Sequence, residues 1–332
     1  MATSTLTALR PLGRTGLEVT GIGLGTAPLG GLFAPVSDSD ADATVRRALD
    51  LGIRYVDTAP LYGHGLSEQR LGASLRRAGD DEVVMSTKVG RIIIADPHAD
   101  TGIYKGIAAS RAAFDFTRRG VLRSLDESLA RLGRLSIDIV LIHDPDDHMD
   151  IAVHEAYPAL ARLRDAGAIR AVGVGTNATA TALRFVRDTD VDCVLIAGRY
   201  TLLDQSAADE LFPACIDRDV AVILGGVYNS GILADVRADA PFDYAPASAD
   251  VLRRARRIAE VCAHHGVPLK AAALQFAGAH PAVTCMVVGA RSAAEVAENL
   301  DMAATRIPAA LWAELRADGL IAAGSPLPGD AT

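Results

Sequence analysis

Hydrophobic residues follow two alternating patterns along most of the chain. Short, continuous apolar runs predict buried strands at residues 19–26, 55–57, 82–88, 137–143, 169–175, 193–197, 220–224 and 283–288. Apolar residues at helical spacing predict helices from about residue 67 and at residues 38–52, 121–133, 156–166, 180–188, 207–218, 247–265, 269–279 and 293–303. Continuous apolar runs are typical of strands that are buried on both faces. This alternation predicts a parallel sheet with right-handed crossovers, and about eight units favour closure into a (β/α)8 TIM barrel.

Three segments do not fit this alternation. Residues 8–18, with Gly13 and Gly16 between apolar positions, predict an N-terminal β-hairpin that plugs the barrel. Residues 308–320 predict an additional C-terminal helix. Residues 89–117 show little periodicity and many small residues, which is typical of a long functional or mobile loop. No linker divides the chain, so we expect one domain over residues 1–332.

Composition narrows the classes of protein that the chain can represent. Its net charge of −8 and the absence of a Lys/Arg run argue against binding to nucleic acid or to an acidic membrane. Its four cysteines are far apart and form no CxxC motif, which indicates free thiols in a reducing cytoplasm. Residues 1–4 begin no apolar signal segment, and the longest apolar stretch is interrupted at His280-Pro281, so we expect neither a signal peptide nor a membrane span.

The glycines at positions 21, 23 and 25 raise the question of a dinucleotide-binding loop of the Rossmann type. That loop needs a helix that opens on its last glycine. Here Pro28 follows, and the next helix begins only near Asp38. We therefore interpret these glycines as the tight end of a barrel strand that a ligand can approach closely.

Polar residues stand where successive strands end. Asp57, Lys88, His143 and Asn177 end four predicted strands, and Tyr62 follows the first of them after a proline turn. Each residue alone has an ordinary structural interpretation, such as a helix cap or a satisfied core histidine. In a barrel, however, the carboxyl ends of the strands meet at one mouth, so these residues together indicate a catalytic site.

The chemistry of these residues is complementary. A free phenol has a pKa of about 10, and a nearby ammonium group favours the phenolate, so Lys88 is expected to lower the pKa of Tyr62. Asp57 is expected to hold Lys88 charged, while His143 hydrogen-bonds the substrate oxygen. The set predicts a general acid/base for hydride transfer to or from a nicotinamide.

Other kinds of site have weaker support. No serine or cysteine stands in a nucleophile motif, which argues against covalent catalysis. The polar run at residues 143–148 suggests a metal site, but no further ligand set accompanies it. Cys262, His264 and His265 precede Gly266 at a predicted helix end, where the imidazoles complement the helix dipole. No metal site is expected.

The sequence resembles the aldo-keto reductase family at several motifs spread over nearly the whole chain. The matching motifs are residues 13–16, 57–63, 86–90, 142–143, 173–177 and 289–292, with Glu298-Asn299. The resemblance implies a (β/α)8 barrel that binds NAD(P) in an extended form across the mouth, without a Rossmann fold. It also implies a catalytic tetrad of Asp57, Tyr62, Lys88 and His143.

The resemblance further implies which residues contact the cofactor and the substrate. The implied cofactor contacts are Thr26, Thr176, Asn177, Gly225, Gly226, Gly289, Arg291, Glu295, Glu298 and Asn299. The implied substrate contacts are Tyr62, His143, Arg199 and Tyr228.

Three positions depart from the pattern of many family members. Ala197 replaces a glutamine that holds the carboxamide, and Gly225 replaces the aromatic residue that stacks on the nicotinamide. Glu295 stands where NADP-preferring members carry an arginine for the 2′-phosphate. A carboxylate repels phosphate but accepts a hydrogen bond from a ribose hydroxyl, so NAD is expected over NADP.

Residues 114–133, 197–205 and 226–231 resemble a group of sugar dehydrogenases that act on L-fucose or D-threo-aldoses. The resemblance implies NAD-dependent oxidation of an aldose at C1 to the lactone. Pyridoxal 4-dehydrogenase, a relative of this group, is the first alternative. A general aldehyde reductase and a non-catalytic nucleotide-sensing protein are the others, and the oligomeric state stays open.

Overall fold

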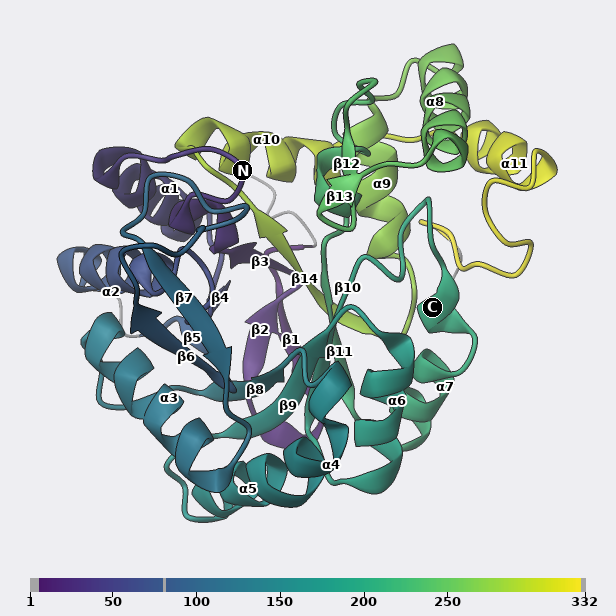
Figure 1. The fold of residues 1–332 in the computed structure, drawn as a ribbon. Coiled ribbons are helices and arrows are strands. Elements are labelled where there is room, and N and C mark those ends of the chain that lie inside the picture. Colours follow the sequence, from purple (N-terminus) through teal and green to yellow (C-terminus); the bar gives the residue numbers. More distant parts are fainter. Residues whose placement is uncertain (1–5, 80–81, 330–332) are drawn as a thin grey trace.

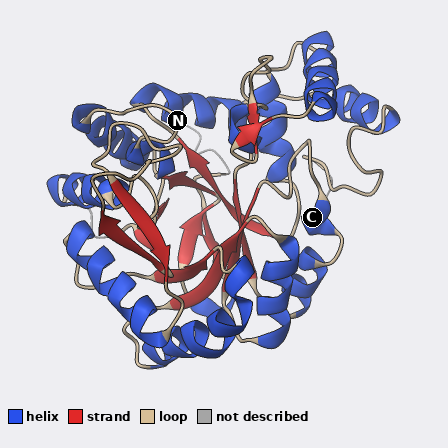
Figure 2. Cartoon of the chain, in the orientation of Figure 1, coloured by secondary structure: helices blue, strands red, loops and turns tan. Residues whose placement is uncertain are grey.

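The protein is described by a computed structural model that covers residues 6–79 and 82–329. Residues 1–4, where no signal peptide is expected, lie outside the described residues. Eight parallel strands form a closed barrel, and they follow one another around it in chain order (Figures 1 and 2). The strands are β3 (Ile22–Gly25), β4 (Tyr55–Asp57), β5 (Val84–Val89), β8 (Ile139–His143), β9 (Ala171–Thr176), β10 (Cys193–Ala197), β11 (Ala221–Gly225) and β14 (Val283–Gly289). The predicted (β/α)8 barrel is thus confirmed.

Helices surround the barrel. Most of them lie in the connections between successive strands, and α10 and α11 follow the last strand. They are α1 (Asp38–Asp50), α2 (Leu66–Ala78), α3 (Arg118–Leu132), α4 (Met149–Ile151), α5 (Tyr157–Asp165), α6 (Thr179–Asp188), α7 (Leu211–Asp217), α8 (Ala249–His264), α9 (Leu269–Ala277), α10 (Ala293–Ala304) and α11 (Ala309–Ala317). Helix α1 begins at a side-chain cap, because the Ser37 hydroxyl accepts a hydrogen bond from the Asp40 amide. Within the described residues, every helix is too short or too polar to cross a membrane.

Two separate hydrophobic cores result from the alternation of side chains along each strand. Outward residues such as Val140 and Ile142 pack against the helices in the larger core. Inward residues such as Ile139 and Leu141 fill the barrel interior. Successive side chains of a strand point to opposite faces, so only every second residue of each strand points into the barrel interior or toward its mouth.

The bottom of the barrel is closed by the N-terminal hairpin. Strands β1 (Leu9–Pro11) and β2 (Glu18–Thr20) pair antiparallel. Leu12, Leu17 and Val19 from this hairpin are buried in the interior core. The hairpin therefore seals the end of the barrel opposite the carboxyl ends of the strands.

The structure corrects several predicted boundaries. Residues 89–117 are not a structureless loop, because β6 (Arg91–Ala95) and β7 (Ser110–Phe114) form an antiparallel hairpin. Small alanines and a turn glycine, Gly90 with φ 98°, hide this hairpin from a periodicity search. The predicted strand at residues 19–26 is divided between β2 and β3 at Gly21, where a Cβ would lie 2.8 Å from the Arg10 guanidinium carbon.

Two helices also begin later than expected. A π-helical segment, Ala152–Ala156, precedes α5, with Pro158 in its first turn. The predicted helix at residues 207–218 is a 3-10 turn, Ser206–Ala208, followed by the shorter α7. A second small hairpin, β12 (Pro241–Phe242) and β13 (Ala245–Pro246), lies in the segment between β11 and α8.

Candidate active site

The last inward-facing residue of each barrel strand faces the mouth. On β8, for example, Ile139 and Leu141 lie in the interior core and His143 is the next inward residue. The corresponding residues around the barrel are Gly25, Asp57, Lys88, His143, Gly175, Ala197, Gly225 and Gly289. Three neighbouring strands thus present ionisable side chains, while the other five present only glycine or alanine.

Lys88 is the centre of the polar side of the mouth. Its ammonium donates to Asp57 Oδ2 at 2.7 Å, to the Thr58 carbonyl at 3.0 Å and to Tyr62 Oη at 2.9 Å. An ammonium has three N–H donors, so all of them are used. Lys88 and Asp57 are only 1% and 3% exposed, so this ion pair is formed away from water.

The turn after β4 brings Tyr62 to Lys88. The Tyr62 amide donates to the Ala59 carbonyl at 3.1 Å, which closes the turn around Pro60. Gly63 follows with φ 61°, and a Cβ there would lie 2.3 Å from the Gly30 carbonyl oxygen. Only glycine satisfies both constraints, so the turn places the phenol within hydrogen-bond reach of Lys88.

Asp57 is itself held by residues that the sequence analysis does not single out. Ser86 donates to Asp57 Oδ1 at 2.7 Å, and the Tyr55 hydroxyl lies 2.9 Å from Ser86 Oγ. Both side chains point into the barrel, two residues before Lys88 and Asp57 respectively. Because side chains alternate along a strand, a residue two positions before a mouth residue also points inward. This spacing can be recognised in the sequence.

The predicted direction of the Tyr62 pKa shift is wrong. Burial raises the pKa of the Tyr62 phenol well above 10, and the nearby Asp57 carboxylate raises it further. The neighbouring ammonium does not reverse this, because it is paired with that same carboxylate. In this structure Tyr62 is therefore a neutral phenol that keeps its proton at neutral pH.

His143 lies beside Tyr62, with its ring edge-on to the phenol and the ring centroids 5.9 Å apart. Burial lowers the His143 pKa well below 6.5, and the charges of Lys88 and Arg91 lower it further. The imidazole is therefore neutral. Its Nδ1 is buried without a hydrogen-bond partner among the described residues, while Nε2 lies 3.5 Å from the Asp144 carboxylate, and this difference favours the tautomer with its proton on Nε2.

Asp144 and Arg91 complete this side of the mouth and are missing from the predicted site. Asp144 follows His143 with φ 45°, and its Oδ2 lies 3.5 Å from His143 Nε2. Arg91, at the start of β6, donates to the same carboxylate oxygen at 2.8 Å. Arg91 lies in the stretch without periodicity, so the sequence offered no signal for this pair.

The predicted cofactor residues form two groups, and the first group lies at the carboxyl ends of β3, β9 and β11. Thr26 and Thr176 are buried, and their hydroxyls donate to the Asp57 carbonyl at 2.9 Å and to Asp146 Oδ1 at 3.1 Å. The backbone of Asn177 accepts a hydrogen bond from Arg199. Gly225 and Gly226 end β11 and begin the next segment.

The remaining predicted cofactor residues follow β14. Arg291 pairs with Glu295, whose carboxylate also accepts the Arg291 amide at 2.8 Å. Glu298 pairs with Lys270 at 2.6 Å. Asn299 accepts from the Tyr228 hydroxyl at 3.1 Å.

The two additional predicted substrate contacts are already engaged within the protein. Arg199 pairs with Asp243 at 2.7 Å and with Asp204 at 3.3 Å. Tyr228 bonds to Asn299, and Lys270 lies over its ring. Arg199 therefore ties three loops at the mouth together.

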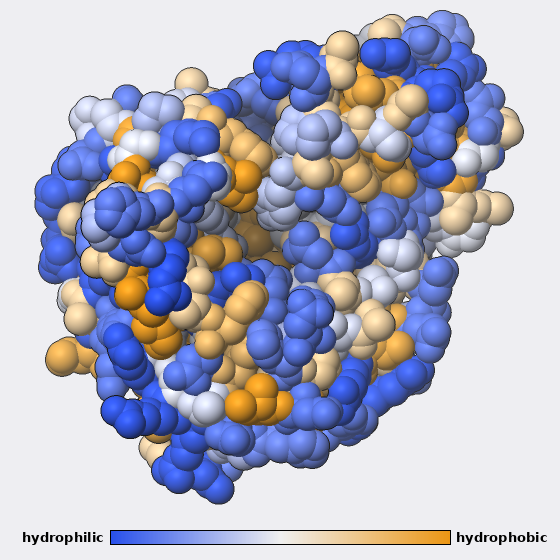
Figure 3. Space-filling view, in the orientation of Figure 1, coloured by the Kyte–Doolittle hydropathy of each residue, from blue (hydrophilic) through white to orange (hydrophobic). Residues whose placement is uncertain are grey.

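The residues at the mouth fit a nicotinamide cofactor. Gly25, Gly175, Gly225 and Gly289 carry no side chain at the mouth, so a ligand can approach the backbone closely beside the polar side. Arg291 after β14 and Lys270 on α9 are bases that suit phosphates, and the carboxylates of Glu295 and Glu298 suit ribose hydroxyls. Figure 3 shows a hollow on this face, with hydrophobic residues in its depth.

Comparisons with known proteins agree with this geometry. The profile of the Aldo/keto reductase family matches residues 21–317. The chain is 42% identical to pyridoxal 4-dehydrogenase of Microbacterium luteolum, over 94% of this chain and 97% of that protein. It is also 42% identical to D-threo-aldose 1-dehydrogenase of a Pseudomonas species, over 92% of this chain and 96% of that protein.

Solved structures support the fold. An aldo-keto reductase of Bacillus halodurans matches with a TM-score of 0.75 and 24% identity, covering 97% of this chain and 98% of that one. Glycerol dehydrogenase of Gluconobacter oxydans matches with a TM-score of 0.74 and 23% identity, covering 100% and 99%. The chain therefore belongs to the aldo/keto reductase family and is an NAD(P)-dependent oxidoreductase.

Proposed function

We propose that this enzyme oxidises the hydroxyl at C1 of a cyclic aldose to a lactone, with Tyr62 as the general acid/base and NAD as the preferred cofactor. The observation that carries the proposal is the Lys88 ammonium, which bonds Asp57 and the Tyr62 hydroxyl at 2.7 Å and 2.9 Å. The Tyr62 oxygen accepts a hydrogen bond from Lys88, so the phenol proton stays available for a substrate oxygen.

The protein's own residues divide the proton chemistry among them. In reduction, the neutral Tyr62 gives its proton to the substrate oxygen, and in oxidation the phenolate takes that proton back. His143, neutral and protonated at Nε2, donates a hydrogen bond to the same oxygen and so positions it. Lys88, held charged by Asp57, stabilises the phenolate as it forms. A nicotinamide held at the mouth would supply or accept the hydride, and its oxidised form would add a positive charge that favours the phenolate.

Sugar and pyridoxal substrates both suit this site, because each has a hydroxyl or hemiacetal group at the reacting carbon. The relatives at 42% identity carry one activity each. Formation of reduced nicotinamide should be followed by absorbance with L-fucose, D-threo-aldoses and pyridoxal under identical conditions. We expect the highest kcat/KM for an aldose. A higher value for pyridoxal would select the alternative, and turnover of none of them would refute both.

The preference for NAD rests on Glu295. Its carboxylate neutralises Arg291, the nearest base after β14, and repels an additional phosphate. We expect NADH to bind more tightly than NADPH in a fluorescence titration. Tighter binding of NADPH would show that Arg291, not Glu295, determines the contact.

We also place the enzyme in the cytoplasm. All four cysteines are buried and free, which suits a reducing compartment.

A further inference from the structure

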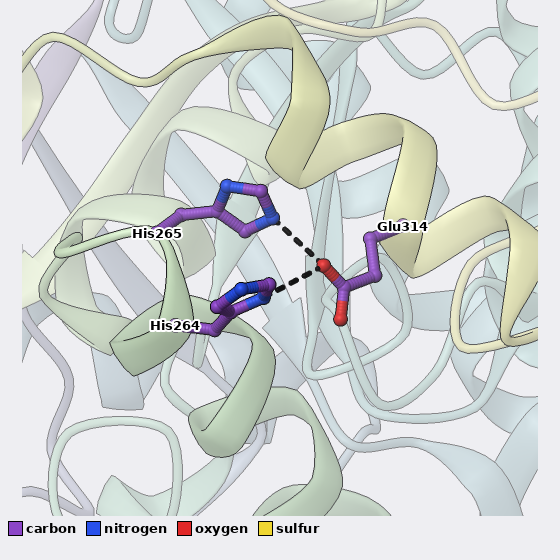
Figure 4. Close-up of side chains that lie close together, drawn as sticks. All are labelled: His264, His265 and Glu314. Atoms are coloured by element: carbon purple, nitrogen blue, oxygen red, sulfur yellow. Dashed lines mark hydrogen bonds and ion pairs between the residues drawn. The ribbon is translucent and has the colours of Figure 1, made fainter.

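The C-terminal end of α8 carries two adjacent histidines, His264 and His265, whose rings converge on one side chain. His264 Nδ1 lies 3.2 Å from Glu314 Oε2, and His265 Nε2 lies 2.8 Å from the same oxygen. Glu314 comes from α11, about fifty positions later in the chain. Figure 4 shows both rings directed at the carboxylate from one side.

This convergence is unusual for neighbouring residues on a helix. Successive side chains on an α-helix point about 100° apart, so residues i and i+1 do not normally face one target. Here His265 is the C-cap, with φ −89° and ψ 3°, and the helix has ended. The two rings reach one oxygen because His264 presents Nδ1 and His265 presents Nε2 to it. Complementing the helix dipole requires only one imidazole near the helix end and does not explain Glu314.

We propose that His264, His265 and Glu314 form a binding site for a divalent transition-metal ion such as Zn²⁺. The three ligand atoms lie within 4.8 Å of one another. Bonds of about 2.0–2.1 Å to a tetrahedral ion separate ligand atoms by roughly 3.3 Å, so small side-chain rotations close the site. Two imidazoles and one carboxylate suit Zn²⁺, and water supplies the fourth ligand.

The surroundings suit a cation and set its pH dependence. Hydrogen bonds from His265 and His264 lower the Glu314 pKa, so the carboxylate is ionised. Arg257 lies 3.9 Å from the other carboxylate oxygen, but it is paired with Asp318 at 2.7 Å and with Glu260 at 3.4 Å. Zn²⁺ competes with protons for the imidazole nitrogens, so binding weakens as the pH falls.

The site would join α11 to α8. Both helices lie away from the mouth at one side of the molecule in Figure 1. Arg257 and Arg254 already hold the end of α11 through Asp318 and the Leu320 carbonyl. The metal therefore strengthens an attachment of the C-terminal segment to α8 that already includes the hydrogen bonds of both histidines to Glu314, and its role is independent of the oxidoreductase chemistry.

The test uses the full chain, without a polyhistidine tag and after treatment with a chelator. Isothermal titration with Zn²⁺ should give about one bound ion per chain, with weaker binding at about pH 5.5 than at about pH 7.5. Addition of Co²⁺ should give the intense visible absorption of a tetrahedral site. These readouts do not depend on enzymatic activity, so failure here leaves the proposed function intact.

Conservative variants identify the ligands. His265→Gln and Glu314→Gln should each weaken Zn²⁺ binding by at least about tenfold, because removing a direct ligand costs more than disturbing its supporting hydrogen bonds. His154→Gln, at an exposed histidine preceding α5, should bind Zn²⁺ as the wild type does. The proposal is overturned if the wild type binds no Zn²⁺, or if both ligand variants bind it unchanged.

Discussion

The mouth of the barrel has two sides that differ in the residues of the same structural row. On β4, β5 and β8 the last inward residues are Asp57, Lys88 and His143, which are buried and in part charged. On β9, β10, β11, β14 and β3 the same row holds only glycine and alanine. Equivalent positions thus carry either the polar groups for which we propose a role in proton transfer or almost no side chain.

The contrast indicates that the two sides of the mouth have different functions. Charged groups next to a low-dielectric interior interact strongly only when they are paired, and the pair of Lys88 and Asp57 meets this condition. Glycine at the other strand ends permits a flat ring to approach the backbone closely. We infer that the polar side handles the substrate proton and the small-residue side accommodates the cofactor.

Removing the proton donor tests the polar side with the largest expected effect. In Tyr62→Phe the ring and its packing stay, but the hydroxyl bonded to Lys88 is lost. General acid/base catalysis contributes about 10²–10⁴-fold, so kcat should fall by that factor while cofactor affinity is kept. Steady-state kinetics and a cofactor titration measure both quantities.

Tyr157→Phe is the matched control, because its hydroxyl bonds the Asp190 amide far from the mouth. Its kcat should stay near the wild-type value. Unchanged turnover in Tyr62→Phe would remove Tyr62 from the mechanism.

Breaking the buried ion pair between Lys88 and Asp57 tests how much the same network contributes to stability. Lys88→Met leaves the Asp57 carboxylate buried without its cation, which costs about 3–5 kcal/mol. The free energy of unfolding in urea should fall by that amount, and activity should be lost with it. Lys105→Met, at an exposed lysine bonded to the Gly102 carbonyl, should change neither quantity. A stable Lys88→Met protein would mean that Asp57 takes up a proton at little cost.

The polar side was largely predictable from the sequence, and the reason is geometric. Short, continuous apolar runs located the strand ends, and Asp57, Lys88 and His143 end three neighbouring strands. Parallel strands bring their carboxyl ends together, so linear positions could be converted into proximity. The pKa of Tyr62 could not be read in this way, because it depends on burial and on the partner of Lys88.

The contact between Arg91 and Asp144 is a feature of the site that the sequence did not predict. Arg91 begins a hairpin of β6, which contains three consecutive isoleucines, and β7, which contains two alanines, and neither strand alternates clearly between apolar and polar residues. Its contact with Asp144 joins positions 53 apart and depends on how that hairpin folds over the mouth. Pairings of this kind are set by tertiary packing, for which local pattern carries no signal.

Filling the small-residue side tests the other half of the comparison. A Cβ at Gly225 would lie 3.3 Å from both Ala197 Cβ and Leu195 Cδ2, so the rest of a larger side chain has to occupy the mouth or displace these two residues. Gly225→Val should weaken NADH binding by at least about tenfold, which corresponds to about 1.4 kcal/mol. Gly324→Val, where a Cβ would meet nothing within 4 Å, is the matched control. Equal NADH affinity in the two variants would place the cofactor elsewhere.

The smallest effect is expected where the two sides meet the substrate. Asp144 holds a carboxylate oxygen 3.5 Å from His143 Nε2, and we expect this oxygen to accept a hydrogen bond from a substrate hydroxyl next to the reacting carbon. Asp144→Asn keeps the shape but weakens a hydrogen bond to a charged acceptor, which costs about 1 kcal/mol, or about fivefold. We expect this change in the KM of an aldose, with little change in kcat for an aldehyde that has no neighbouring hydroxyl. Asp147→Asn, at an exposed position in the same loop, should leave both values unchanged. An equal loss for both substrates would instead mean that Asp144 acts through His143, by positioning the imidazole and not by contacting the sugar.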